Sequence, residues 1–285
     1  MSMVVNIDGL FIDPQMACLP LDDGAVLFGD TIFETLKTRA GRIRFLEEHL
    51  DRMELAARLL AFPFDRPVLR EALTATAQRL DATVGRLRLT LTRGAFTGLH
   101  LPPAAQGRYF ILARPYAEPT ESDRTTGVVC VIAPNRRVNP LSHLPQMKRG
   151  NYVDCLYAAD FARRRGAREA LFVSAEGCVL EGATSNLFAL QDDTLVTPPA
   201  GELVLAGIMR RQVLRAAAGF GLQVEERDVR LDELFAADEV FLTNSLIDLL
   251  PVSQIEGRPL RRGTLTKRLR TAIDGLAGER EESPA

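Results

Sequence analysis

Apolar and polar positions alternate in some stretches of the chain and recur at helical spacing in others, and the two kinds of stretch follow one another in mixed order. Residues 31–39 alternate, and Ala40-Gly41 then predicts the turn of a hairpin. Residues 46–61 keep helical spacing until Pro63 stops the helix. The same reasoning predicts strands at residues 4–13 (a hairpin), 86–92, 108–114, 127–133, 169–174, 178–181, 186–190, 222–228, 239–243 and 252–255, and helices at 67–80, 152–165, 208–220 and from 264 onward.

This order of elements favours an α+β fold, because an α/β fold with a parallel sheet needs strict alternation of strand and helix. Residues 115–126 are polar and contain proline, which is typical of a linker. A chain of 285 residues is long enough for two domains with separate cores. We therefore expect two lobes, a smaller N-terminal α/β lobe of residues 1–118 and a larger C-terminal lobe of residues 119–285.

Composition and charge argue against several classes of function. The chain is 46% hydrophobic and 25% charged, and its net charge of −2 leaves no basic surplus for nucleic acid or an anionic membrane. The first residues lack the pattern of a signal peptide, and no run of about 18 apolar residues occurs. We therefore expect a cytoplasmic enzyme that acts on a small molecule.

The four cysteines are widely scattered, and the chain has only three histidines. Neither a disulfide framework nor a metal site is expected from such spacing, and buried apolar thiols explain the cysteines better.

Lysine is scarce, since only Lys37, Lys148 and Lys267 occur among the 35 basic residues. Lys148 lies just before the helix predicted over residues 152–165. A lysine in an apolar setting loses solvation of its charged form, so a neutral amine becomes available to attack a carbonyl. Lys148 is therefore a candidate imine-forming lysine. A lysine that extends its amine to solvent from the end of an element is the alternative.

Glu181 ends an apolar strand and precedes Gly182. A carboxylate there is able to keep the ring nitrogen of an aldehyde cofactor protonated, which makes that cofactor an electron sink. A glutamate in a solvent-facing turn is the alternative explanation.

Two segments offer donors to a phosphate group. Gly207-Ile208-Met209 opens a predicted helix, whose N-terminal N–H groups attract anions. Asn244-Ser245 follows a predicted buried strand. Arg52 is a candidate cationic partner, although a surface pair with His49 also explains its position.

Six segments in this order resemble the class IV aminotransferases, the fold-type IV pyridoxal phosphate enzymes, over nearly the whole chain. They are Phe28-Gly29-Asp30 with Phe33-Glu34, Glu48-His49-Leu50-Asp51-Arg52, Lys148-x-x-Asn151-Tyr152, Glu181-Gly182-x-x-Ser185-Asn186-Leu187-Phe188, Gly207-Ile208-x-Arg210, and Thr243-Asn244-Ser245-Leu246.

The resemblance implies roles for the matching residues. Lys148 would form the imine with pyridoxal 5'-phosphate and carry protons, and Glu181 would pair with the pyridine nitrogen. The other cofactor-binding residues would be Arg52, Tyr152, Ser185, Asn186, Gly207, Ile208, Met209, Asn244 and Ser245, and those near the substrate would be Phe33, Lys37, Thr97 and His100. The resemblance also implies a two-lobed fold with the cofactor between the lobes, and a homodimer whose partner completes the site.

Within this family, Thr243-Asn244-Ser245-Leu246 and the spacing of Lys148 to Asn151 resemble 4-amino-4-deoxychorismate lyases most. In that reading Lys148 forms the aldimine and removes the α-proton, and β-elimination of pyruvate gives 4-aminobenzoate. The substrate loop departs from the pattern, because Gly98 stands where related enzymes place a carboxylate-binding arginine. An aminotransferase for D-amino acids, branched-chain amino acids or primary amines is therefore the alternative, and a family member without catalysis is a third.

Overall fold

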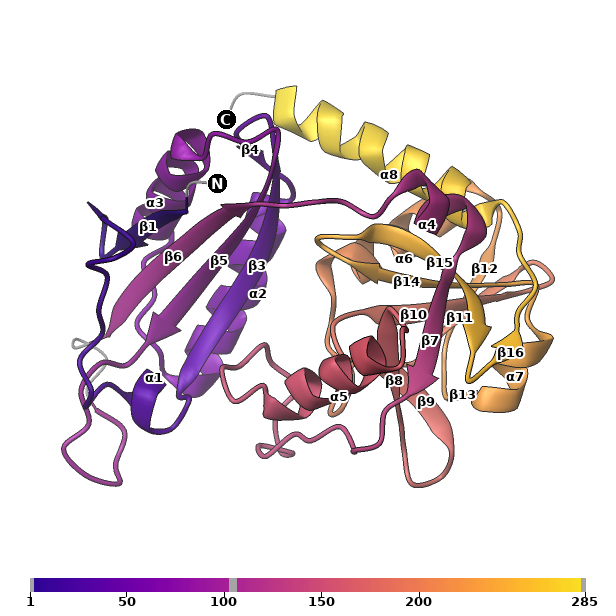
Figure 1. The fold of residues 1–285 in the computed structure, drawn as a ribbon, viewed down its shortest axis with the longest axis horizontal. Helices are drawn as coiled ribbons and strands as arrows, with labels where there is room; N and C mark the ends of the chain where they lie inside the picture. Colours follow the sequence, from indigo (N-terminus) through magenta and orange to yellow (C-terminus); the bar gives the residue numbers. More distant parts are fainter. Residues whose placement is uncertain (1–2, 103–106, 283–285) are drawn as a thin grey trace. The chain divides into compact units, whose positions relative to one another are not determined.

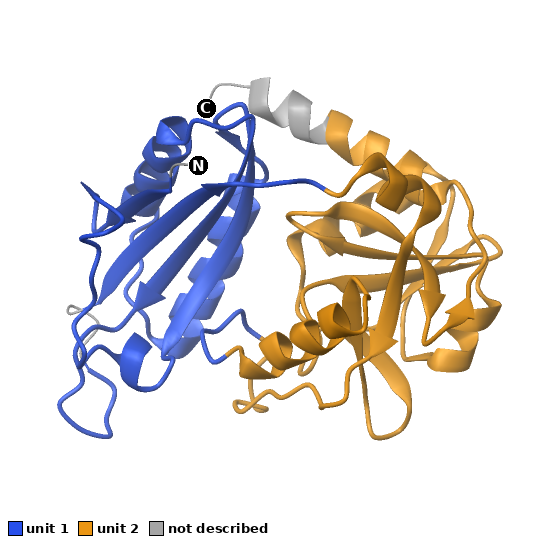
Figure 2. Ribbon diagram, viewed as in Figure 1, with its two compact units in different colours: residues 1–118, 147–151 blue, residues 119–146, 152–285 orange. Residues whose placement is uncertain are grey.

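The computed structural model describes residues 3–102 and 107–282, with side chains as far as residue 275. The chain forms two compact units, residues 1–118 with 147–151 and residues 119–146 with 152–285 (Figure 2). The sequence placed residues 147–151 in the C-terminal lobe, but the structure places them in the first unit. The backbone N–H of Phe33 donates to Lys148 O at 2.9 Å, and that of Gly150 donates to Thr31 O at 2.8 Å. These long-range bonds attach the segment to a strand of unit 1.

Unit 1 contains a six-stranded antiparallel sheet with the order β2-β1-β6-β5-β3-β4 (Figure 1). Its strands are β1 (Val4–Ile7), β2 (Leu10–Ile12), β3 (Thr31–Arg39), β4 (Arg42–Ile43), β5 (Val84–Thr92) and β6 (Arg108–Pro115). Asp8 and Gly9 have φ values of 51° and 87°, which form the tight turn expected between β1 and β2.

The helices of unit 1 are α1 (Gly24–Leu27), α2 (Leu46–Leu60) and α3 (Arg66–Arg79). Helix α2 packs against β3 and buries Leu50 and Met53, as its apolar spacing predicts. Asp65 accepts a hydrogen bond from the Val68 N–H at 3.1 Å and caps α3. The sequence analysis did not predict α1, because four residues are too few to show helical periodicity.

Unit 2 contains a ten-stranded mixed sheet with the order β12-β11-β10-β14-β15-β7-β8-β9-β13, and β16 pairs with β15. The pairs β7–β8, β7–β15 and β11–β12 are parallel. The strands are β7 (Val128–Ile132), β8 (Glu169–Val173), β9 (Cys178–Gly182), β10 (Asn186–Gln191), β11 (Thr194–Thr197), β12 (Gln223–Glu226), β13 (Val229–Arg230), β14 (Glu239–Asn244), β15 (Asp248–Ile255) and β16 (Arg258–Pro259).

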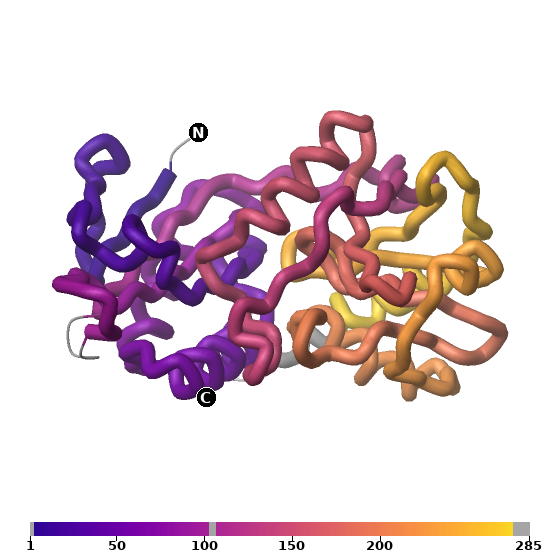
Figure 3. The backbone as a smooth tube through the Cα atoms, turned by 90° about the horizontal axis from the view of Figure 1, so that it is seen from below, coloured from indigo at the N-terminus to yellow at the C-terminus, as the bar shows by residue number. Residues whose placement is uncertain are grey.

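The helices of unit 2 are α4 (Glu121–Thr126), α5 (Val153–Arg164), α6 (Ile208–Gly219), α7 (Leu231–Ala236) and α8 (Leu265–Glu282). Helix α5 packs on β8, where its buried Cys155, Ala158 and Ala162 meet Ala170 and Phe172. Helices α6 and α8 contact each other and β14. The path of the backbone through each unit can be followed in Figure 3.

One predicted linker is wrong in part. The sequence assigned residues 115–126 to a linker, but Glu121–Thr126 forms α4. Thr120 Oγ1 accepts from the Asp123 N–H at 3.0 Å, and Asp123 accepts from the Thr120 N–H at 2.8 Å. This Thr-x-x-Asp capping box stabilises the helix start, and it was readable in the sequence.

The α+β class expected from the order of elements is confirmed, with mixed sheets in unit 2 and an antiparallel sheet in unit 1. Among the described residues, no helix combines the length and apolar character that a membrane span requires.

Candidate active site

Lys148 lies beside β3 in unit 1, on the short segment that pairs with Thr31 and Phe33. Its Nζ is 4.5 Å from the centre of the Phe33 ring, and the guanidinium carbon of Arg88 is 3.6 Å from the centre of the same ring. Phe33 is buried, with 2% of its surface exposed. One aromatic ring therefore positions both an amine and a guanidinium.

The sequence analysis did not single out Arg88. In the register of β3 with β5, Thr35 is opposite Arg88 and Phe33 is opposite Thr90. Alternation therefore puts Arg88 on the same face of the sheet as Phe33. Strand alternation contained this signal, but it becomes readable only once the register of β3 with β5 is known.

Arg52, predicted to contact phosphate, belongs to a buried cluster in unit 1. Its Nε and Nη2 donate to the two carboxylate oxygens of Glu34 at 2.7 and 2.6 Å, and His49 Nδ1 lies 2.7 Å from Glu34 Oε2. Burial by itself would raise the pKa of Glu34, but the charge of Arg52 and the bonds from His49 and Arg52 lower it to about 2. Burial lowers the pKa of His49 despite that bond. The guanidinium of Arg52 is therefore oriented by an ionised carboxylate.

The structure places three predicted substrate residues away from the ring of Phe33. Lys37 lies four residues further along β3, is buried, and forms an ion pair with Glu118, which also pairs with Arg39 at 3.0 Å. Thr97 and His100 lie in the exposed loop after β5. A Cβ at Gly98 would lie 3.2 Å from His100 Nδ1, so the loop folds His100 back over this glycine.

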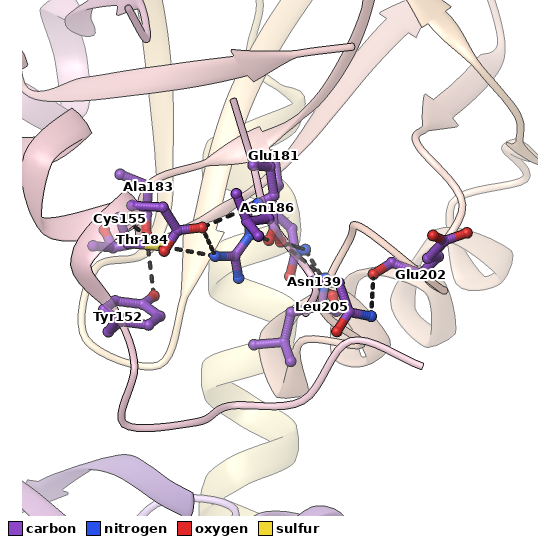
Figure 4. A network of polar contacts seen from close by, with 12 residues as sticks. Asn139, Tyr152, Cys155, Glu181, Ala183, Thr184, Asn186, Glu202 and Leu205 are labelled. Carbon is purple, nitrogen blue, oxygen red and sulfur yellow. Dashed lines mark hydrogen bonds and ion pairs between the residues drawn. The ribbon is translucent and has the colours of Figure 1, made fainter. Parts of the chain in front are cut away.

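Glu181 and Asn186 lie at the ends of β9 and β10 in unit 2, joined by a tight turn in which the Gly182 N–H donates to Ser185 O at 2.7 Å. Glu181 is 5% exposed. Its Oε2 accepts from Asn186 Nδ2 at 3.2 Å and from the Leu205 N–H at 3.0 Å (Figure 4). The alternative of a solvent-facing glutamate is therefore wrong.

Arg137, which the sequence analysis missed, contacts the other side of this carboxylate. Its Nε donates to Glu181 Oε1 at 3.2 Å, and its Nη1 donates to Asp154 Oδ2 at 2.7 Å and to Cys155 Sγ at 3.0 Å. Burial would lower the pKa of Arg137, but Glu181, Cys155 and Asp154 raise it, so the guanidinium stays charged. Arg137 lies in a loop without periodicity, where the sequence offers no signal of these partners.

Tyr152 immediately precedes α5, and its hydroxyl donates to Ala183 O at 3.1 Å (Figure 4). Burial raises the pKa of Tyr152 well above its usual value, so the phenol stays neutral. Burial also raises the pKa of the neighbouring Cys155 to about 12, which leaves its thiol protonated. Arg137 lies 5.9 Å from the centre of the Tyr152 ring. Tyr152, Glu181 and Asn186 thus belong to one network in unit 2.

The N-terminus of α6 is open to an anion. Gly207 is the N-cap, no side chain caps the helix, and its first turn carries no acidic residue. The first helical bond runs from the Arg211 N–H to Gly207 O at 3.0 Å, so the amides of Ile208, Met209 and Arg210 have no intrahelical acceptor. Arg210 Nε is also buried without a hydrogen-bond partner.

The remaining predicted cofactor residues have protein partners. Ser185 Oγ donates to buried Glu169 at 2.9 Å. Asn244 Oδ1 accepts from the N–H groups of Leu246 and Ile247 at 2.9 Å each, which shapes the turn between β14 and β15. Ser245 lies inside that turn and is half-buried. Asn244 therefore orders the loop that presents Ser245.

The structure thus divides the predicted residues between the two units. Unit 1 holds Lys148, Phe33, Arg52, Lys37, Thr97 and His100, and unit 2 holds Tyr152, Glu181, Ser185, Asn186, Gly207, Ile208, Met209, Asn244 and Ser245. Within residues 3–102 and 107–275, no group of three or more His, Cys, Asp or Glu side chains is arranged to hold a metal ion.

Comparisons with known proteins agree on one family. The family model described as amino-transferase class IV matches residues 31–255. A putative branched-chain-amino-acid aminotransferase of Methanocaldococcus jannaschii is 30% identical over 276 residues, covering 94% of each chain. The crystal structure of the Escherichia coli branched-chain amino acid aminotransferase matches with a TM-score of 0.87 at 25% identity, covering 96% of this chain and 94% of that one.

A third relative is a branched-chain amino acid aminotransferase from T.th., solved with pyridoxamine 5'-phosphate. It matches with a TM-score of 0.86 at 27% identity and covers 97% of this chain and 94% of that one. These relatives are named aminotransferases, so they support the aminotransferase alternative and give no support to the lyase. The resemblance read from six short segments is confirmed along most of the sequence, and the chain belongs to the class IV aminotransferase family.

Proposed function

We propose that the protein is a pyridoxal 5'-phosphate-dependent aminotransferase that moves an amino group from a branched-chain amino acid to a 2-oxo acid. The observation that carries this proposal is the fixed amine of Lys148, 4.5 Å from the centre of the buried Phe33 ring. The names of the relatives favour branched-chain substrates over D-amino acids and primary amines.

The residues present fit this cofactor. Glu181 offers a buried carboxylate for the ring nitrogen, and three N–H groups at the start of α6 offer donors for the phosphate. The space that a Cβ of Gly207 would fill is occupied by Asn186, so the backbone there is bare. Ser245 and Arg52 are further phosphate contacts in this proposal. When bound, pyridoxal 5'-phosphate supplies an aldehyde that takes up amines and a protonated ring that accepts their electrons.

The side chains of this chain then have distinct tasks. Lys148 Nζ holds the cofactor aldehyde, and it takes the proton from the substrate α-carbon and returns it at the aldehyde carbon. Glu181 keeps the ring nitrogen protonated, and Arg137 holds Glu181 in place from the other side. Tyr152 remains a neutral hydrogen-bonding phenol.

Arg88 is the residue proposed to bind a substrate carboxylate. Its guanidinium lies on the same Phe33 ring as the Lys148 amine, and a guanidinium pairs with carboxylate through two parallel hydrogen bonds. Gly98 supplies no side chain for this purpose. Phe33 itself offers an apolar wall that suits a branched-chain side chain.

Absorbance and product analysis test the proposal. The purified protein should show a band near the visible edge after addition of pyridoxal 5'-phosphate, and leucine or valine with 2-oxoglutarate should give glutamate. Lys148→Ala should lose glutamate formation and should lose covalent fixation of the cofactor by borohydride. Formation of 4-aminobenzoate from aminodeoxychorismate, without glutamate formation from any amino acid, would overturn the aminotransferase assignment in favour of the lyase.

We also propose that the enzyme is a homodimer, as the family resemblance implies. Light scattering coupled to size-exclusion chromatography measures this directly. A mass near twice 31.4 kDa supports the dimer, and a mass near 31.4 kDa at assay concentration contradicts it.

A further inference from the structure

We propose that Asn186 is a positioning residue that fixes Glu181 relative to the N-terminus of α6, and that it does not contact the cofactor ring. This proposal rests on the proposed function, because it takes Glu181 as the partner of the ring nitrogen and α6 as the phosphate site. It replaces the role expected from the family resemblance, which put Asn186 against or near the ring.

The amide hydrogens of Asn186 are both engaged within the protein. Nδ2 donates to Glu181 Oε2 at 3.2 Å and to Leu205 O at 2.9 Å (Figure 4). A primary amide has two N–H donors, so neither remains for a cofactor. Asn186 is 5% exposed, which agrees with an internal role.

Leu205 completes a closed arrangement. Its N–H donates to Glu181 Oε2 at 3.0 Å while its carbonyl accepts from Asn186. The carboxylate, the amide and the peptide backbone therefore form a ring of three hydrogen bonds. Leu205 lies two residues before Gly207, so this ring holds the carboxylate against the segment that leads into α6.

Gly207 shows how closely the two parts are fitted. A Cβ at this position would lie 2.0 Å from Asn186 Oδ1. The backbone of Gly207 has φ −67° and ψ 142°, which any residue can adopt. Glycine is therefore required here by the space that the Asn186 side chain occupies and not by backbone conformation.

The consequence concerns a ligand with two anchoring points. A cofactor held at its ring nitrogen by Glu181 and at its phosphate by α6 gains from a fixed spacing, because the second contact then forms without further ordering. Loosening the spacing should weaken binding of the whole cofactor, while it should change binding of a ligand with only one of the two groups far less.

The test compares pyridoxal 5'-phosphate with pyridoxal, which lacks the phosphate, by absorbance titration of the cofactor-free protein. Asn186→Ala should weaken binding of pyridoxal 5'-phosphate by about tenfold or more, and binding of pyridoxal by less than about threefold. Gly207→Ala should behave in the same way. In the double variant the added methyl group fills the vacated space, so it should bind no more weakly than Asn186→Ala alone.

Asn139→Ala is the matched control. Asn139 is also a buried asparagine whose Nδ2 donates to two backbone carbonyls, those of Leu144 at 3.0 Å and Glu202 at 2.8 Å. This variant should lower the thermal midpoint of unfolding and leave the ratio of the two affinities unchanged.

Two results would overturn the positioning role: equal weakening of both ligands by Asn186→Ala, or additive losses in the double variant. The first would mean a direct ring contact. A wild-type protein that binds the two ligands equally well, or that is indifferent to Glu181→Gln, would instead overturn the proposed function. The two failures are therefore distinguishable.

Discussion

Arg137 donates from Nε to Glu181 Oε1 at 3.2 Å, and both side chains are about 6% exposed. The same guanidinium pairs with Asp154 at 2.7 Å, in the first turn of α5. Arg137 therefore joins the strand end that carries Glu181 to the helix that begins after Tyr152. Replacing one guanidinium disturbs both carboxylates at once.

Arg137→Met should destabilise the protein by about 3–5 kcal/mol, because it leaves two buried carboxylates without their cation. Urea-induced unfolding of the cofactor-free protein measures this loss. Arg137→Lys keeps the charge but not the fork of donors, so its loss should be smaller. A loss below about 1 kcal/mol for Arg137→Met would contradict the assigned role, since that is the range of exposed pairs.

The Glu34–His49–Arg52 cluster should make stability depend on pH. The folded pKa of Glu34 is lowered from 4.5 to about 2, and that of His49 is lowered from 6.5. The unfolded chain therefore binds more protons than the folded one at acidic pH, so stability rises with pH. The contribution of His49 should be lost as pH falls below 6.5, and that of Glu34 as pH falls from 4.5 towards 2.

Unfolding free energies measured from pH 8 to pH 3 would reveal these two steps. His49→Gln should flatten the upper step and leave the lower one, and Glu34→Gln should flatten the lower one. An unchanged profile in His49→Gln would show that His49 is not the group that titrates.

The comparison of sequence with structure separates local signals from long-range ones. Hairpin turns, helix spacing and caps are encoded within a few residues, so β1–β2, α2 and α3 were predicted nearly to the residue. The attachment of Lys148 to β3 joins residues more than a hundred positions apart, and no local pattern contains it.

The site follows the same division. Lys148 and Glu181 were identified because a lone amine and a lone carboxylate occur in apolar surroundings. Arg137 and Arg88 were missed because arginine is abundant here, and only tertiary contacts distinguish these two from the others.

Lys37 should prove structural, although the sequence placed it near the substrate. Its side chain is fully buried in an ion pair with Glu118. Glu118→Gln should therefore destabilise the protein by about 3 kcal/mol, because a buried ammonium loses its partner. Lys37→Met with Glu118→Gln should recover most of that stability and keep the Michaelis constants for both substrates. Thermal unfolding and initial rates check the two parts, and a large rise in either Michaelis constant would restore Lys37 to the substrate site.

Arg88→Leu should impair recognition of a substrate carboxylate. A charge-assisted hydrogen-bonded pair contributes about 1.5–3 kcal/mol, so kcat/KM for 2-oxoglutarate should fall by about 10- to 100-fold. Binding of pyridoxal 5'-phosphate should stay within about threefold of wild type, since Arg88 is proposed to contact substrate and not cofactor. Arg86→Leu is the matched control, because Arg86 lies two residues away on β5 and is exposed. Equal losses in the two variants would mean that Arg88 acts only through the general charge of the strand.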